Sequence, residues 1–139
     1  MALTEILSAI REEADAAVAE IGRVLMRYTT LTKALQDGAR HASVYGLVGA
    51  SQVVNIDAAL DAEIRNLVVY GNTQGTGTPV LAGLSPGQLN ITVPQPGWIQ
   101  VDANYPYVPA LGTAIPSFGL GATPNMNFNL TASVTMRAL

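Results

Sequence analysis

The chain has 139 residues, a formal net charge of −3 and no cysteine. Its length suits one domain with a substantial core. The acidic balance argues against nucleic-acid binding, because few basic side chains could neutralise phosphates. Without cysteine there can be neither a disulfide framework nor a thiolate metal site.

The charged residues are concentrated in the first half of the chain. Residues 1–70 hold six of the seven basic and nine of the ten acidic side chains, whereas residues 71–139 hold only Asp102 and Arg137. A segment with two charges, abundant apolar residues and many Thr, Asn, Gly and Pro residues is typical of an antiparallel sheet with long turns.

The first quarter of the chain predicts a long amphipathic helix. Its apolar residues alternate steps of four and three over five repeats without a proline. The helix is expected to end near Gly46 or Gly49, where glycine can adopt the left-handed cap. Part of it should project or pair with a partner. The apolar seam consists of Leu3, Leu7, Ile10, Ala14, Ala17, Ile21, Val24, Tyr28, Leu31 and Leu35.

The next segment predicts a second helix and a short strand. Asn55 is a good N-cap, Asp57 suits the first turn, and the helix is expected from about Ile56 to Arg65. Leu67–Tyr70 is an apolar run of strand type. Residues 71–88 should form a long irregular connection.

Three further strands have period-two patterns. The first runs from Asn90 to Val93, and a turn at Pro96-Gly97 follows it. The second begins at Trp98. Pro106 and Pro109 break its hydrogen-bond ladder, so we expect that stretch at a sheet edge or at the end of the strand. One face of this strand carries Ile99, Val101, Ala103, Tyr105 and Tyr107, and one face of the last strand carries Met126, Phe128, Leu130, Ala132, Val134 and Met136. The expected fold is α+β, a long N-terminal helix packed on a small antiparallel sheet.

Four stretches together resemble a known family. They are Glu20-Ile-Gly-Arg, the stretch from Leu31 to Val44 (Leu-Thr-Lys-Ala-Leu-Gln-Asp-Gly-Ala-Arg-His-Ala-Ser-Val), Tyr105-Pro-Tyr, and Leu130-Thr-Ala-Ser-Val-Thr-Met-Arg. In order and spacing they resemble TadE-like and TadG-like minor pilins of the tight-adherence (Flp, type IV) pilus. The resemblance covers residues 20–139 and implies a single pilin-like globular domain over that range.

Residues 1–19 depart from the family pattern. Members of the family carry an apolar membrane anchor before the position of Glu20, whereas Ser8–Val18 is polar at every third or fourth residue. The resemblance implies that the anchor has been replaced, by engineering, with a water-soluble helix. A natural soluble relative is the alternative. The natural protein is expected to be anchored in the inner membrane and to be periplasmic or extracellular in the pilus, with a membrane contact only through the missing anchor.

The resemblance implies a non-enzymatic structural subunit that takes part in pilus assembly. Its expected partners are other pilins and pilus assembly proteins, and the helix could also mediate self-association. Glu5 stands at the offset of the pilin glutamate that pairs with a neighbouring subunit, although an exposed helix-start carboxylate is the alternative. The remaining candidates for subunit contacts are the seam residues Ile21, Val24, Tyr28, Leu31 and Leu35.

Two other classes of function stay open. Trp98 is a candidate surface contact, and a surface adhesin-like module could recognise a glycan or protein through it and the loops. The alternative for Trp98 is packing under residues 71–88. His41 is the only histidine, so a multi-histidine metal site is excluded, and a hydrolase using it is the third hypothesis. No catalytic, metal or cofactor site is predicted.

Overall fold

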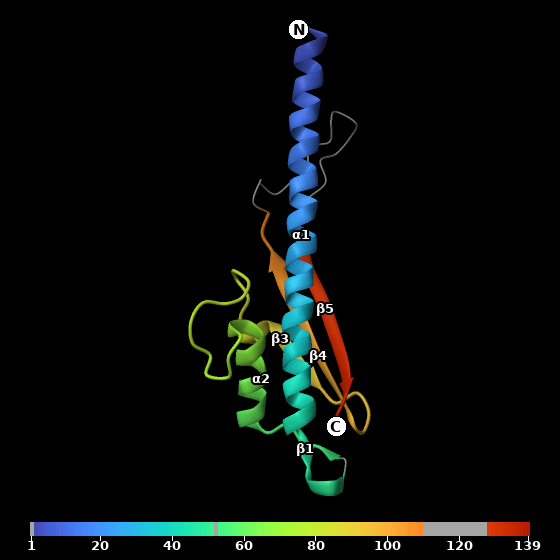
Figure 1. Cartoon of the computed structure of the whole chain (residues 1–139), viewed down its shortest axis with the longest axis vertical. Helices are drawn as coiled ribbons and strands as arrows, with labels where there is room; N and C mark the ends of the chain where they lie inside the picture. The colour runs from blue at the N-terminus through green and yellow to red at the C-terminus, as the bar shows by residue number, and fades with distance from the viewer. Residues whose placement is uncertain (1, 52, 110–127) are drawn as a thin grey trace. The chain divides into compact units, whose positions relative to one another are not determined.

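The computed structural model describes residues 2–51, 53–109 and 128–139 (Figure 1). It confirms the α+β class, and the described residues form two α-helices and two small antiparallel sheets. The elements are α1 (Leu3–Tyr45), β1 (Leu47–Val48), β2 (Val53–Val54), α2 (Ala58–Tyr70), β3 (Leu89–Thr92), β4 (Trp98–Tyr107) and β5 (Phe128–Arg137), with short 3-10 helices at Gly49–Ser51 (η1) and Pro86–Gln88 (η2).

The chain forms two compact units. Of the described residues, the first comprises 2–27, 106–109 and 128–129, and the second comprises 28–51, 53–105 and 130–139. Helix α1 and strands β4 and β5 each contribute residues to both units. The division expected from the sequence, between residues 1–19 and 20–139, stays a prediction.

Helix α1 confirms the long helix predicted from the seam and ends at Tyr45. The Gly46 N–H donates to the Ala42 carbonyl oxygen at 2.8 Å and closes the last turn. The left-handed cap predicted here is wrong for Gly46, which does not have a positive φ. Glycine is needed at Gly46 for space, because a Cβ there would lie 2.5 Å from the Ala42 carbonyl oxygen.

Helix α2 begins later and ends later than the sequence predicts. Asp57, rather than Asn55, is the N-cap, and its carboxylate accepts the Leu60 N–H at 2.8 Å. The helix ends at Gly71, whose φ of 75° gives a left-handed cap. The strand predicted at Leu67–Tyr70 is therefore wrong. A short apolar run cannot by itself distinguish a strand from a buried helical turn, and here Val68 continues a buried helical row.

The larger sheet has the strand order β3-β4-β5. Strand β3 pairs antiparallel with β4, with Leu89 opposite Ala103 and Thr92 opposite Gln100. The inner face of β4 is buried as predicted, and Leu130 and Ala132 are buried on β5. Met126 lies outside the described residues. The hairpin of β1 and β2 was not predicted, since each strand has only two residues.

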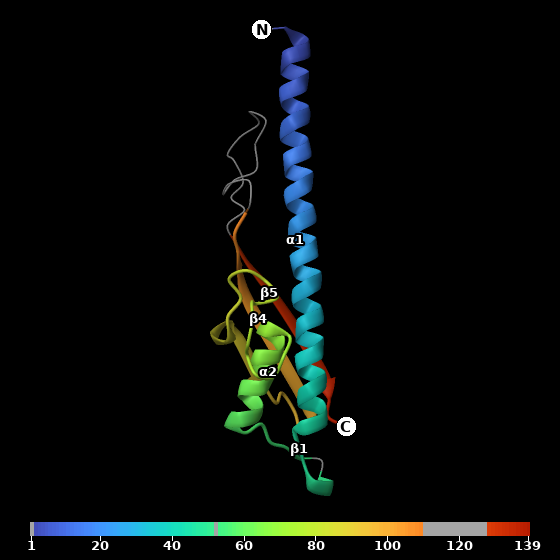
Figure 2. The same cartoon turned by 60° about the vertical axis from the view of Figure 1, so that its left-hand side comes forward.

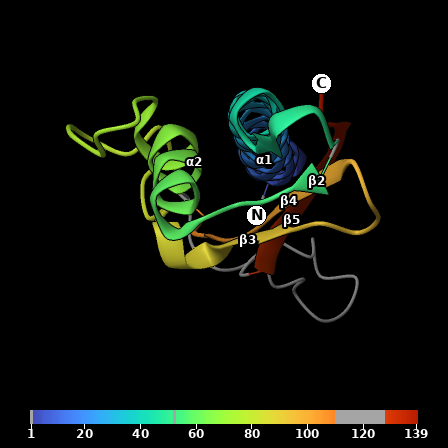
Figure 3. The ribbon, with the colours of Figure 1, turned by 90° about the horizontal axis from the view of Figure 1, so that it is seen from below.

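The core of the second unit lies between the sheet and the end of α1. Leu31, Leu35, Ala39 and Ala42 are fully buried. The Leu139 N–H donates to the Ser43 carbonyl oxygen, which places the C-terminus beside α1 (Figure 2). Helix α2 and residues 28–45 of α1 lie on the same face of the sheet (Figure 3). Other fully buried residues of this core are Ile64, Val68, Val69, Ile99 and Val101.

Candidate functional site

Trp98 and Arg137 are neighbours across strands β4 and β5. The Ala138 N–H donates to the Gly97 carbonyl oxygen at 2.8 Å. The Thr135 hydroxyl lies 3.5 Å from the Gln100 side-chain oxygen, to which it donates. Both contacts fit one antiparallel register, in which Arg137 stands directly opposite Trp98. Side chains at opposed positions point to the same face, so the indole and the guanidinium share the outer face of the sheet.

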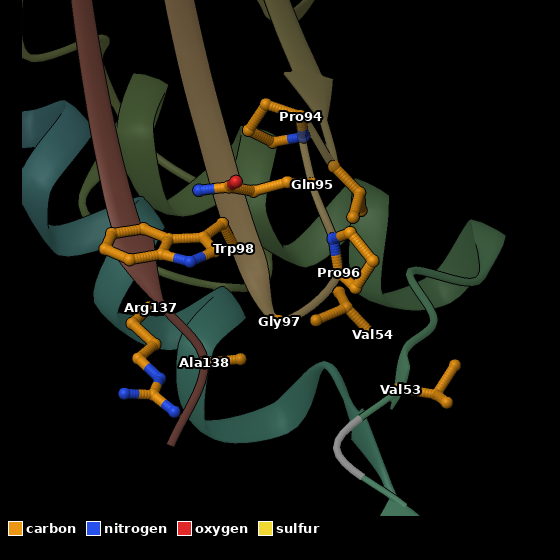
Figure 4. A pocket seen from close by; sticks show the side chains of 10 residues that line it. Val53, Val54, Pro94, Gln95, Pro96, Gly97, Trp98, Arg137 and Ala138 are labelled. Carbon is orange, nitrogen blue, oxygen red and sulfur yellow. The ribbon is translucent and has the colours of Figure 1, made fainter.

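These two residues line a groove of about 770 Å³ at one end of the second unit. Trp98 and Arg137 come from the neighbouring strands β4 and β5. Val53 and Val54 of strand β2 lie on the other side of the groove (Figure 4). The turn between β3 and β4 supplies the rest of the wall. The described residues that line it are Val53, Val54, Val93, Pro94, Gln95, Pro96, Gly97, Trp98, Arg137 and Ala138.

Among the groove residues that the structure describes, Arg137 is the only one with a charged side chain. Within the described ranges it makes no ion pair with an acidic side chain. The other charge of residues 71–139, Asp102, accepts hydrogen bonds from the Gln100 amide at 2.9 and 3.0 Å. The groove therefore offers one cation, one half-buried indole and a largely apolar wall.

Trp98 does not pack under residues 71–88, so that alternative is wrong. None of the groove residues belongs to that connection. The connection is fixed instead at Tyr105, whose hydroxyl donates to the Ala82 carbonyl oxygen at 2.6 Å. The prediction of Trp98 as a surface contact stays open, and the groove shows which surface it would use.

A second site lies in the first unit, around the buried carboxylate of Glu20. Glu20 is only 3% exposed, and it accepts a hydrogen bond from the Tyr107 hydroxyl. The Arg23 guanidinium lies 3.4 Å from the other carboxylate oxygen. The Arg27 guanidinium lies 5.8 Å from the centre of the Tyr107 ring. The centre of the Phe128 ring lies 5.7 Å from that of the Tyr107 ring.

This environment changes the acidity of the tyrosine. Burial, together with the hydrogen bond and the negative charge of Glu20, raises the pKa of Tyr107 to about 12, and the charges of Arg27 and Arg23 lower it by less. The hydroxyl thus stays a donor at neutral pH and satisfies one oxygen of the buried carboxylate. The sequence places Glu20 and Tyr107 in two separate motifs of the resemblance, but their pairing over 87 positions carries no local signal.

The predicted subunit contacts divide into two groups. Glu5 is exposed, Ile21 and Tyr28 are 49% and 45% exposed, and Val24 is half-buried. Leu31 and Leu35 are 0% exposed because they pack into the core of their own unit. The prediction that these two leucines contact another subunit is therefore wrong for this folded state. The seam gives no sign of this change, since its spacing is the same on both sides of residue 28.

His41 has a local role. Its Nε2 lies 3.0 Å from a Glu63 carboxylate oxygen, and its ring packs 4.6 Å from that of Tyr45. The contact with Glu63 joins α1 to α2 within the second unit, whereas Tyr45 lies on α1 itself. Over the described ranges 2–51, 53–109 and 128–139, no group of three His, Asp or Glu side chains could hold a metal ion.

A search of the described residues for membrane-spanning helices finds none of sufficient length and apolarity. No protein-family model matches the chain, and searches of curated proteins and of solved structures give no significant match.

Proposed function

We propose that the protein is a minor pilin, or pseudopilin, a non-enzymatic structural subunit of a type IV pilus of the tight-adherence kind. Its expected partners are other pilins and pilus assembly proteins. The proposal is carried by one observation: the apolar seam of α1 is exposed toward its N-terminal end and buried toward its C-terminal end.

The exposed part of the seam supports the proposal in the following way. Leu3, Leu7, Ile10 and Ile21 are between 45% and 71% exposed. An exposed apolar row with heptad spacing is suited to packing against other helices. The buried part of the same seam ties the helix to its own sheet. One helix thus combines a surface for assembly with the core of a globular unit.

The Glu20 cluster adds independent support. Glu20 and Tyr107 belong to two of the stretches by which the chain resembles minor pilins, and they are joined by a buried hydrogen bond. A buried carboxylate is costly unless it is paired, so both residues are needed together. This pairing gives a physical reason for the two motifs to occur in the same chain.

Cysteine cross-linking in cells that build a tight-adherence pilus tests the proposal. The chain has no cysteine, so a single introduced thiol reports one position. Ile21→Cys places the thiol on the exposed seam, and Thr30→Cys places it about 180° around the helix at another exposed position. Both variants would carry an added apolar anchor before residue 20, since a subunit must wait in the membrane before assembly.

The expected result is a cross-link from Ile21→Cys to another pilus subunit carrying a thiol on its own helix. The control variant Thr30→Cys should give little or none. Equal cross-linking from both positions, or none from either while the pilus forms, would contradict the proposal.

A second candidate function is a surface adhesin-like module. The groove between Trp98 and the β1–β2 hairpin favours it, because an indole in an open groove is a common contact for a ligand. An adhesin should hold its ligand in the absence of any pilus component, whereas the pilin proposal requires contacts with other subunits.

A further inference from the structure

We propose that the outer face of the sheet at Trp98 and Arg137 binds an acidic oligosaccharide, with a uronate carboxylate on Arg137 and a pyranose ring on Trp98. This inference goes beyond the pilin proposal and stands independently of it, because it concerns a ligand site rather than subunit packing.

The placement of Arg137 is the first step. It is exposed, it is the only charged side chain of the groove, and no acidic side chain in the described part of the chain pairs with it. A guanidinium presents a planar fork that matches a carboxylate with two parallel hydrogen bonds.

Trp98 provides the second element of recognition. The register places it directly opposite Arg137, and such neighbours have Cβ atoms about 5 Å apart. The face of an indole carries partial negative charge and attracts the partly positive C–H groups of a sugar ring. A uronic acid combines a C–H face and a carboxylate within one ring, which matches the adjacent indole and guanidinium.

The next positions along the sheet favour a sugar over a peptide. About 6.8 Å along the strands from Trp98 and Arg137, the outer face of the sheet presents the Gln100 amide beside the Thr135 hydroxyl. Thr92 stands opposite Gln100 on strand β3. Amide and hydroxyl groups complement the hydroxyls of a neighbouring sugar unit, whereas a peptide would need further apolar pockets here.

Asp102 limits the site and orients the ligand. It stands on the same face as Trp98 and Gln100, two positions beyond Gln100. Its carboxylate would repel a second uronate, although it already accepts hydrogen bonds from the Gln100 amide. The ligand carboxylate is therefore expected at the Arg137 end, and neutral hydroxyls at the Gln100 end.

Titration of the full chain with an aldobiouronic acid, a disaccharide of one uronic acid and one neutral sugar, tests the proposal. Trp98 is the only tryptophan, so tryptophan fluorescence reports this groove alone. We expect a saturable change in its emission. The methyl ester of the same disaccharide, which keeps the rings and removes the charge, should bind at least about tenfold more weakly, since hydrogen bonds between charged groups contribute most of the recognition.

Matched variants make the result specific to the site. Arg137→Gln should weaken binding of the aldobiouronic acid by about tenfold or more, whereas Arg40→Gln removes an exposed cation elsewhere and should leave it within about twofold. Trp98→Ala should abolish binding, which is measured by calorimetry because this variant has no tryptophan. Trp98→Tyr should restore part of it, which separates loss of stacking from loss of folding.

Several outcomes would overturn the proposal. They are no saturable response to the aldobiouronic acid, equal binding of its methyl ester, and equal weakening by Arg40→Gln. Tighter binding of a capped Leu-Glu-Leu peptide, competing at the same site, would show that the groove takes an acidic peptide and would overturn the sugar class. None of these outcomes bears on the cross-linking test of the pilin proposal.

Discussion

The buried carboxylate of Glu20 is the most informative single residue in the structure. It lies on α1 among apolar seam residues and is satisfied by Tyr107 and Arg23. An acidic side chain that is almost fully buried normally requires such partners. The pair explains why the first unit needs both the end of β4 and the helix.

Removal of the tyrosine hydroxyl should destabilise the protein. Tyr107→Phe leaves one oxygen of the buried Glu20 carboxylate without its hydroxyl donor, which is expected to cost about 1–3 kcal/mol in the free energy of unfolding. Urea unfolding of Tyr107→Phe, Glu20→Gln and the double variant measures the coupling. A sum of the single effects equal to the double effect, within about 0.5 kcal/mol, would show that the two residues do not interact.

The same pair predicts a loss of stability at alkaline pH. Because the pKa of Tyr107 is raised to about 12 from 10.0, the folded state holds this proton more tightly than the unfolded state. The resulting stabilisation is complete below pH 10 and is lost as the pH rises through about 12. The free energies of unfolding of the native protein and of Tyr107→Phe should therefore converge over that pH window. Parallel pH profiles would contradict the assignment.

At the scale of elements, close contact between α1 and α2 depends on Gly38. A Cβ at Gly38 would lie 2.5 Å from the Val68 Cγ2 atom and 3.5 Å from Ile64 Cγ2. Gly22 on the same helix has nothing within 4 Å of a Cβ. The two glycines are thus a matched pair, one at a helix contact and one in open space.

Substitution of the two glycines should have opposite effects. Gly38→Ala is expected to destabilise the protein by about 1–3 kcal/mol, because Val68 and α2 must move to admit the methyl group. Gly22→Ala should stabilise it by up to about 1 kcal/mol through helix propensity. Both are measured as changes in melting temperature. Equal shifts in the same direction would show that α1 and α2 do not approach closely at Gly38.

The alternation along β5 gives another element-scale prediction. Ala132 is 7% exposed, and its neighbour Ser133 is exposed on the outer face. Ala132→Asp would bury an unpaired carboxylate and should cost more than about 3 kcal/mol, whereas Ser133→Asp should cost less than about 1 kcal/mol. Denaturant midpoints compare the two. Similar midpoints would mean that the inner and outer faces of β5 are wrongly assigned.

Sequence periodicity predicts the long elements well and the short ones poorly. The repeat of α1 and the alternation of β4 and β5 extend over many residues, so each has redundant signals. The four-residue run at Leu67–Tyr70 has no such redundancy. It is helical because its apolar side chains pack into the core as the last turn of α2. The two-residue strands β1 and β2 carry no period at all.

The candidate sites depend on pairings between distant residues. Trp98 could be singled out as an aromatic residue on a polar strand face, but its neighbour Arg137 follows only from the register of β4 and β5. In the same way, the loss of Leu31 and Leu35 as contact candidates follows from the sheet that covers them.

At the scale of the whole molecule, the central claim is that this chain is a pilus subunit. Its helix supplies exposed apolar positions, and its sheet supplies an outer face with few charges and a groove. A subunit of this kind acts by packing, so no reacting group is required. His41, paired with Glu63, should accordingly be replaceable by Ala with an effect on packing only.

Rescue of pilus formation tests the central claim most directly. An apolar anchor of about 20 residues would replace residues 1–19, and the protein would be expressed in cells that lack their native tight-adherence minor pilin. We predict that this protein reaches the inner membrane and restores pili, counted by electron microscopy, and that the chain with its present N-terminal helix does not. Absence of pili with the anchored protein stably present in the membrane, or restoration of pili by the chain as it stands, would contradict the account.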